Sequence, residues 1–172
     1  MQLSIVAKTL GLLLMVFSFA QVPPILVDLI YSEGEYLTFV FSFILTVFGG
    51  LVLWWPFRAI KKSFRLREGV LIVVSFWIVL SLFGTLPFLI TESISNLSFS
   101  NAFFESMSGL TTTGATVLSQ LDDLPKSILF YRQQLQWLGG MGIIVLAVAV
   151  LPLLGVGGME LYHAESSGIA KD

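Results

Sequence analysis

The chain has 172 residues, of which 56% are hydrophobic and 12% charged, and its mean hydropathy is +0.91. A soluble domain carries about 25% charged residues, so the composition is typical of a membrane protein and excludes an ordinary soluble domain. A net charge of −2 gives no sign of a nucleic-acid partner, and the absence of cysteine together with a single histidine excludes disulfides, thiolate metal sites and histidine metal clusters.

Residues 9–27 are the first of four apolar runs of spanning length, since a membrane helix needs about 20 apolar residues. Pro23 and Pro24 are expected to kink or end this helix near the membrane surface. The run also resembles a cleavable signal peptide, with the small residues SFA before Gln21. Its apolar stretch is longer than the roughly 7–15 residues of a signal, so we predict a retained span.

Residues 36–57 and 69–91 are the second and third uncharged runs of spanning length. Residues 133–159 are long enough to cross with a tilt or a kink, which gives an all-α membrane protein with four transmembrane helices. The fourth run contains Gly139, Gly140 and Gly142. We interpret these glycines as points of close helix packing, with a hinge as the alternative.

The connectors set the orientation of these spans. The stretch RAIKKSFRLRE (58–68) joins the second and third runs and holds five of the nine basic residues. Short loops rich in lysine and arginine stay on the cytoplasmic side, so both termini are predicted to be cytoplasmic. The acidic connector 31–35 and the segment 92–126 then lie outside. The five basic residues are Arg58, Lys61, Lys62, Arg65 and Arg67.

The segment 92–126 is too long for a simple turn. Ser98 or Ser100 provides a side chain that favours a helix N-terminus, and residues 100–111 suit a helix about 18 Å long, at about 1.5 Å per residue. A helix of this length is too short to cross a bilayer. We predict a re-entrant pore helix that enters the membrane partway, between the third and fourth spans.

The residues TTTGAT, Thr111 to Thr116, follow this helix directly. Their β-branched side chains favour extended backbone, whose carbonyls can replace the hydration shell of an ion, and Gly114 permits backbone angles that side chains forbid. The helix C-terminus carries about −0.5 of a charge and favours a cation; Asp122 and Asp123 would add a negative outer mouth. The pattern indicates a pore loop, and the alternative is a surface loop with a turn at TTTG.

Two stretches carry a resemblance to a known family. FFESMSGLTTTGATVL (103–118) and QQLQWLGGMG (133–142) resemble the first pore repeat of the bacterial Trk potassium-uptake membrane subunits, TrkH and TrkG, of the Trk/Ktr/HKT superfamily. The resemblance implies two preceding helices with a basic loop (1–68), one helix–pore loop–helix repeat (69–160) and a cytoplasmic linker (161–172). The chain would then be an N-terminal fragment that supplies one of four filter segments.

The resemblance also implies which residues form the filter. K+ would be bound by the backbone carbonyls of Thr112, Thr113 and Gly114. Against the potassium-channel string TVGYG, only Thr112 and Gly114 match in type, so strict discrimination of potassium against sodium does not follow. In order from the inner to the outer end, the implied filter residues are Thr111, Thr112, Thr113, Gly114, Ala115 and Thr116.

The surroundings of the chain follow from the same resemblance. It implies a location in the bacterial inner membrane, in contact with lipid and with the missing pore repeats or other copies of the chain. It further implies a dimer of the full-length protein and a cytosolic nucleotide-binding regulatory subunit of the TrkA type. Because K+ passes without chemical change, neither an enzyme activity nor a cofactor is expected.

Two ionisable residues fall at membrane depth, where an unpaired charge is costly. Glu105 lies in the short helix and Arg132 near the outer end of the fourth span. We expect them to pair, or Glu105 to accept backbone N–H groups behind the filter. The alternative is that Arg132 extends to the outer surface and Glu105 faces water. Gln133 and the glutamines near it are expected to hydrogen-bond between helices.

The sequence therefore predicts a part in potassium transport, in which this chain contributes one filter segment of a Trk-type uptake system. Two alternatives stay open. One is a small homotetrameric cation channel, in which four copies each supply a filter strand. The other is a non-conducting remnant or structural membrane protein.

Overall fold

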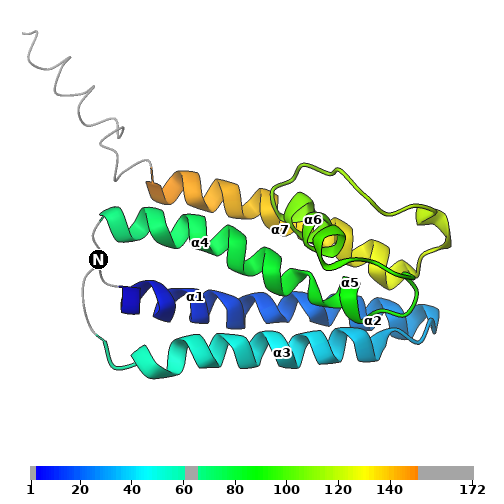
Figure 1. The fold of residues 1–172 in the computed structure, drawn as a ribbon, viewed down its shortest axis with the longest axis horizontal. Helices are drawn as coiled ribbons and strands as arrows, with labels where there is room; N and C mark the ends of the chain where they lie inside the picture. Colours follow the sequence, from blue (N-terminus) through cyan, green and yellow to red (C-terminus); the bar gives the residue numbers. More distant parts are fainter. Residues whose placement is uncertain (1–2, 61–65, 151–172) are drawn as a thin grey trace, which may run out of the picture. The chain divides into compact units, whose positions relative to one another are not determined.

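The computed structural model describes residues 3–60 and 66–150, and the regular structure in these ranges is entirely helical (Figure 1). The chain divides into two compact units, Met1–Gly140 and Met141–Asp172. The site described below lies in the first unit; the described part of the second continues α7. In chain order the elements are α1 (Leu3–Ser18), η1 (Phe19–Gln21), α2 (Val22–Tyr31), α3 (Tyr36–Trp54), η2 (Trp55–Phe57), α4 (Leu66–Gly84), α5 (Leu86–Ile90), α6 (Phe99–Leu110), η3 (Leu121–Asp123) and α7 (Lys126–Val150), where η marks a 3-10 helix.

Three helical stretches in the described residues are long and apolar enough to cross a membrane: Leu3–Tyr31, Tyr36–Phe57 and Leu71–Ile90. They correspond to the first three runs predicted from the sequence, although the first is longer than the predicted 9–27. The all-helical, membrane-type fold is therefore confirmed. The predicted fourth span, 133–159, extends past the described residues, and α7 already begins at Lys126.

The prolines of the first stretch do not end it. The α-helix changes to a 3-10 turn at Phe19–Gln21 and resumes as α2, which carries Pro23 and Pro24 in its first turn. A helix makes no use of the backbone N–H groups in its first turn, so proline fits there without losing a hydrogen bond. The prolines thus mark a local irregularity within one long helical stretch.

Close packing of α1 against α3 depends on glycine. A Cβ added to Gly11 would lie 2.7 Å from the carbonyl oxygen of Gly50, and one added to Gly50 would lie 2.6 Å from the side chain of Met15. Both distances are shorter than side chains tolerate, so the two backbones touch where neither residue has a side chain. Small residues at such crossings are the usual means of association between membrane helices.

Tyr131 holds α7 in place. Its ring is fully buried and lies 5.7 Å from the ring of Phe39 on α3 and 5.4 Å from that of Phe88 on α5, measured between centroids. Its hydroxyl donates a hydrogen bond of 3.0 Å to the carbonyl of Gly84, at the end of α4. These contacts fix the rotation of α7 about its own axis, and hence the direction in which Arg132 and Gln136 project.

Two carboxylates at one end of the bundle, which we call the capping carboxylates, are Asp28 and Glu33. Asp28 accepts the backbone N–H groups of Glu35 and Tyr36, both at 2.9 Å, at the start of α3. Glu33 accepts those of Lys126 and Ser127 at 2.9 and 3.2 Å, at the start of α7. Helix N-termini leave unpaired N–H groups and favour negative charge. Glu33 of the acidic connector, which the sequence predicted only to be an external loop, therefore caps α7, as Asp28 of α2 caps α3.

Candidate functional site

The candidate site is the segment that follows α6, residues 111–118, which we call the threonine–glycine segment. α6 begins where expected, since the hydroxyl of Ser98 accepts the N–H of Asn101 at 3.2 Å and caps the helix. It ends at Leu110, one residue short of the predicted 111. Figure 1 shows α6 nearly end-on beside α4 and α7, so it is steeply inclined to the long helices. The buried residues of α6 are mostly small or polar: Ala102, Glu105, Ser106, Ser108, Gly109 and, at the end of the helix, Leu110.

The segment leaves α6 through a left-handed turn at Thr112. The N–H of Thr113 bonds to the carbonyl of Ser108 at 2.9 Å, and the N–H of Thr112 bonds to that of Gly109 at 2.9 Å. This pair of bonds is the Schellman arrangement that ends many helices, with the left-handed position usually taken by glycine. Here a threonine occupies it with φ of +58°. A β-branched residue in this conformation is a true outlier.

The sign of the backbone angle φ alternates from Thr111 to Gly114. Thr111 has φ of −80°, Thr112 +58° and Gly114 +72°, while Thr113 is not among the residues of positive φ. Alternation of this kind turns neighbouring N–H groups toward one side. Accordingly, the N–H groups of Thr113 and Gly114 both point at the carbonyl of Ser108, at 2.9 and 3.3 Å.

The carbonyl that precedes each of these N–H groups in the chain must point the other way. In a trans peptide the N–H is opposed to the preceding carbonyl, and the described peptide bonds include no cis bond. Because the N–H groups of Thr112, Thr113 and Gly114 point back toward α6, the carbonyls of Thr111, Thr112 and Thr113 point away from it. Within residues 3–60 and 66–150, these carbonyls and that of Gly114 accept no hydrogen bond. Their residues are exposed, and carbonyl oxygens without a hydrogen-bond partner are the kind of ligand that can replace the hydration shell of an ion.

The direction reverses at Ala115. Its carbonyl accepts a hydrogen bond of 2.7 Å from the hydroxyl of Ser108 and is therefore turned toward α6. Of the filter residues expected from the sequence, Ala115 thus differs from Thr112 and Thr113 in the direction of its carbonyl. The hydroxyls of Thr111 and Thr113 lie 2.9 Å apart on the exposed side.

Glu105 fixes the far end of the segment. One of its carboxylate oxygens accepts hydrogen bonds from the hydroxyl of Thr116 at 2.6 Å and from the N–H groups of Val117 and Leu118 at 2.6 and 3.3 Å. The other accepts the Nε–H of Arg132 at 3.0 Å, and both charged side chains are buried. Both kinds of partner that the sequence predicted for Glu105, namely Arg132 and backbone N–H groups, are present. The alternative, with Arg132 at the surface and Glu105 in water, is excluded.

Two glycines of α7 face this region. A Cβ on Gly139 would collide with the carbonyl of Leu110, the last residue of α6, and would lie 3.0 Å from the Cα of that residue. A Cβ on Gly140 would lie at an ordinary 3.9 Å from the methyl group of Thr112. Gly139 therefore provides the close contact expected of these glycines, while Gly142 lies on α7 beyond the first unit.

The three glutamines of α7 point in different directions. Gln133 is exposed. Gln136 is the one that faces it, since its amide nitrogen lies 3.6 Å from where a Cβ of Gly114 would stand. Gln134 is half-buried, and its amide oxygen has no hydrogen-bond partner among the described residues.

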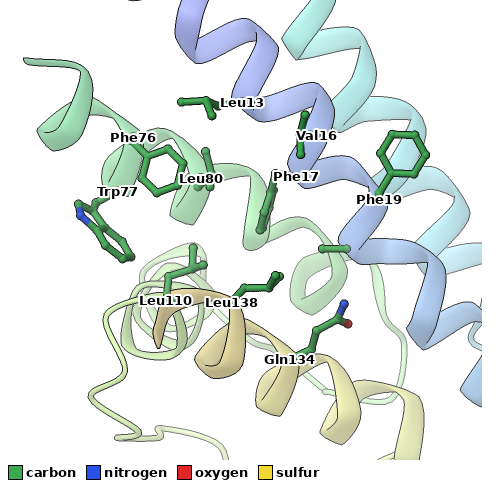
Figure 2. A pocket seen from close by; sticks show the side chains of 12 residues that line it. Leu13, Val16, Phe17, Phe19, Phe76, Trp77, Leu80, Leu110, Gln134 and Leu138 are labelled. Atoms are coloured by element: carbon green, nitrogen blue, oxygen red, sulfur yellow. The ribbon is translucent and has the colours of Figure 1, made fainter. Parts of the chain in front are cut away.

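A separate cavity of about 390 Å³ lies among α1, α4, α6 and α7 (Figure 2). Its lining is apolar except for the amide of Gln134, and Figure 2 shows the rings of Phe76, Trp77 and Phe17 around it. A dehydrated cation needs several oxygen ligands, which these side chains do not offer. This cavity is therefore not suited to hold a cation.

Comparison with known proteins identifies a family for this chain. Residues 36–172 match the family described as TrkH, cation transport protein. The Trk system potassium uptake protein TrkH of Halomonas elongata is 54% identical over 172 residues, which are 100% of this chain and 36% of that protein. The Trk system potassium uptake protein TrkG of Escherichia coli is 42% identical over 168 residues, 98% of this chain and 34% of the relative.

A solved structure shares both the sequence and the fold. The crystal structure of the potassium transporter TrkH from Vibrio parahaemolyticus is similar with a TM-score of 0.85 and 53% identity, covering 98% of this chain and 36% of that chain. The chain thus spans about a third of the length of these relatives, between 34% and 36%. From the family match over residues 36–172 and from these identities, the chain belongs to the TrkH family of cation transport proteins.

Proposed function

We propose that this chain takes part in the transport of K+ across the bacterial inner membrane by contributing one of four filter segments to a Trk-type uptake system. The observation that carries the proposal is the run of carbonyls at Thr111, Thr112 and Thr113, which point away from α6 and accept no hydrogen bond from the described residues. The relatives named as potassium uptake proteins support the choice of ion.

The proposed mechanism is replacement of water by carbonyl oxygens. K+ leaves its hydration shell and is bound by the carbonyls of Thr112, Thr113 and Gly114, as in other channels whose filters are rings of backbone oxygen. The C-terminus of α6 adds a partial negative charge at the start of the segment. The hydroxyls of Thr111 and Thr113 are further oxygen ligands at its inner end. No bond of the ion is made or broken covalently, so the role needs neither an enzyme activity nor a cofactor.

The membrane arrangement that goes with this role has four spans. The fourth comprises 133–159 together with the start of α7, and α6 is a re-entrant helix between the third and fourth spans. Residues 1–68 are the preceding helices, 69–160 the first pore repeat and 161–172 a cytoplasmic linker, with both termini inside. The basic stretch 58–68 supports this orientation through the positive-inside rule.

Partners complete the proposed assembly. One segment surrounds only a quarter of an ion, so three further pore repeats close the ring. Lipid covers the exposed apolar faces, and the full-length protein forms a dimer that works with a regulatory nucleotide-binding subunit of the TrkA type. The exposed side of α6, which includes Phe99 and Phe104, supports contact with these other repeats.

The test uses the complete transporter, made by placing residues 1–172 in the equivalent part of the Vibrio parahaemolyticus protein. Cells that lack their own potassium uptake should grow at low K+ and take up Rb+ when they carry it. Gly114→Ser should lower the uptake at least tenfold, because residue 114 has φ of +72° and faces Gln136, so a side chain there strains the backbone.

Other outcomes decide against the proposal. Unchanged uptake in Gly114→Ser contradicts the assignment of the filter. If residues 1–172 alone cross-link to a tetramer and conduct K+ in liposomes, the chain is instead a homotetrameric channel. If the complete transporter carries no K+ although it reaches the membrane, the segment is a non-conducting structural element.

A further inference from the structure

Ser108 touches the threonine–glycine segment with both its backbone and its side chain. Its carbonyl accepts the N–H groups of Thr113 and Gly114, and its hydroxyl donates to the carbonyl of Ala115 at 2.7 Å. Three consecutive residues of the segment are therefore held by one buried residue of α6. The two kinds of contact have opposite consequences for carbonyl direction.

The backbone contacts direct carbonyls away from α6, because N–H groups that point at Ser108 leave the preceding carbonyls on the far side. The side-chain contact does the reverse, because it draws the oxygen of Ala115 toward α6. The run of carbonyls that can face an ion is therefore interrupted at Ala115, whose carbonyl accepts the Ser108 hydroxyl. A buried hydroxyl that donates to a carbonyl holds its direction more firmly than exchangeable water does.

We propose that Ser108 is a specificity-determining positioning residue, whose hydroxyl keeps the carbonyl of Ala115 out of the ion path and ends the ion-binding run at Gly114. This inference rests on the proposed function, since it concerns the ion selected by the same segment. The number of coordinating carbonyls and the rigidity of their frame govern the choice between K+ and Na+. A carbonyl released at Ala115 adds an oxygen that is free to move, and a filter that can contract accepts the smaller Na+ more readily.

The chain offers a matched control two residues away. Ser106 also lies on α6 and is fully buried, yet its hydroxyl has no hydrogen-bond partner among the described residues. Ser106→Ala and Ser108→Ala remove the same atom from the same helix. Only the second removes a hydrogen bond to the segment.

The experiment measures inhibition of Rb+ uptake by Na+ in cells that carry the complete transporter described above, with uptake normalised to the amount of protein in the membrane. Ser108→Ala should lower the preference for K+ over Na+ by about two- to tenfold, the factor that corresponds to one neutral hydrogen bond. Ser106→Ala should leave the preference unchanged. Ser108→Thr, which keeps the hydroxyl, should restore it at least in part.

If Ser108→Ala does not accumulate in the membrane, Ser108→Cys serves in its place, because a thiol has nearly the same shape and is a weaker donor. An unchanged preference in the Ser108 variant, or an equal shift in Ser106→Ala, overturns the inference while uptake by the parent protein still supports the proposed function. A parent protein that carries no K+ overturns the proposed function first.

Discussion

Thr112 shows what a single residue contributes to the site. The left-handed position that ends a helix costs an ordinary L-residue roughly 1–2 kcal/mol, and threonine is among the least suited to it because its Cβ is branched. Its φ of +58° is nevertheless held by the hydrogen bonds of Thr112 and Thr113 to the end of α6. Strained residues of this kind gather at functional sites. The sequence indicated a special conformation for Gly114 and gave no sign of one at Thr112.

The ion pair of Glu105 and Arg132 gives a prediction at the same scale. Both side chains are buried, so removing one partner leaves a buried charge unpaired. Glu105→Gln or Arg132→Gln alone should each destabilise the complete protein by about 3–5 kcal/mol. The double substitution should cost less than the sum of the two, with a coupling of about 0.5–3 kcal/mol.

Thermal unfolding of the four purified proteins in detergent measures this coupling. Strictly additive losses would show that the two side chains act independently, contrary to the distance of 3.0 Å between them. Glu33→Gln is a suitable control, because it removes a charge from a carboxylate that caps a helix rather than from this pair.

At the scale of elements, α6 was predictable and the rotation of α7 was not. The short helix was expected over 100–111 with a serine cap, and it spans Phe99–Leu110 with Ser98 as the cap, because local chemistry decides where a helix begins. Three glutamines within four residues of α7 cover several faces, so the sequence could not show which one meets the segment. Tyr131 decides it through its contacts with α3, α4 and α5, and Gln136 rather than Gln133 faces Gly114.

The contact between α7 and the end of α6 predicts opposite effects for two adjacent glycines. Gly139→Ala should destabilise the complete protein by about 1–3 kcal/mol, because the new methyl group collides with the backbone of Leu110, which cannot give way as a flexible side chain can. Gly140→Ala should leave stability unchanged or raise it by up to about 1 kcal/mol, since it has room at 3.9 Å from Thr112 and alanine favours a helix.

Unfolding temperature and Rb+ uptake report the two effects separately. The collision pushes α7 and Leu110 apart, and a displaced Leu110 also displaces Thr111, which follows it in the chain. Gly139→Ala should therefore lose uptake, while Gly140→Ala keeps it. Equal behaviour of the two variants would contradict the packing described for α6 and α7.

At the scale of the whole molecule, composition alone identified a helical membrane protein, because apolar runs of spanning length leave few other folds. The first three spans followed from these runs. The caps formed by Asp28 and Glu33 did not, since Glu33 and Lys126 lie far apart in the sequence and only tertiary structure brings them together.

Residues 111–117 are exposed in the chain by itself, which predicts how the isolated chain behaves. Without further repeats around the pore axis, the segment 92–126 should be cut readily by protease in residues 1–172 reconstituted in liposomes, because exposed irregular backbone opens at little cost. In the complete transporter the same segment should resist cleavage. Mass spectrometry of the fragments locates the cuts, and equal resistance in both proteins would contradict the need for the other repeats.

The capping carboxylates also determine where the bundle can adapt to bilayers of different thickness. Asp28 ties the start of α3 to α2, and Glu33 ties the start of α7 to the loop that follows α2. Glu35 in turn accepts the hydroxyl of Thr91, just after α5, at 2.7 Å. Helices tied at one end cannot slide past each other there, so a mismatch with the hydrocarbon thickness must be taken up at the opposite end. In the proposed membrane arrangement, the threonine–glycine segment, which lies between α5 and α7 in the chain, would consequently keep a constant depth below the tied surface while the other surface moves.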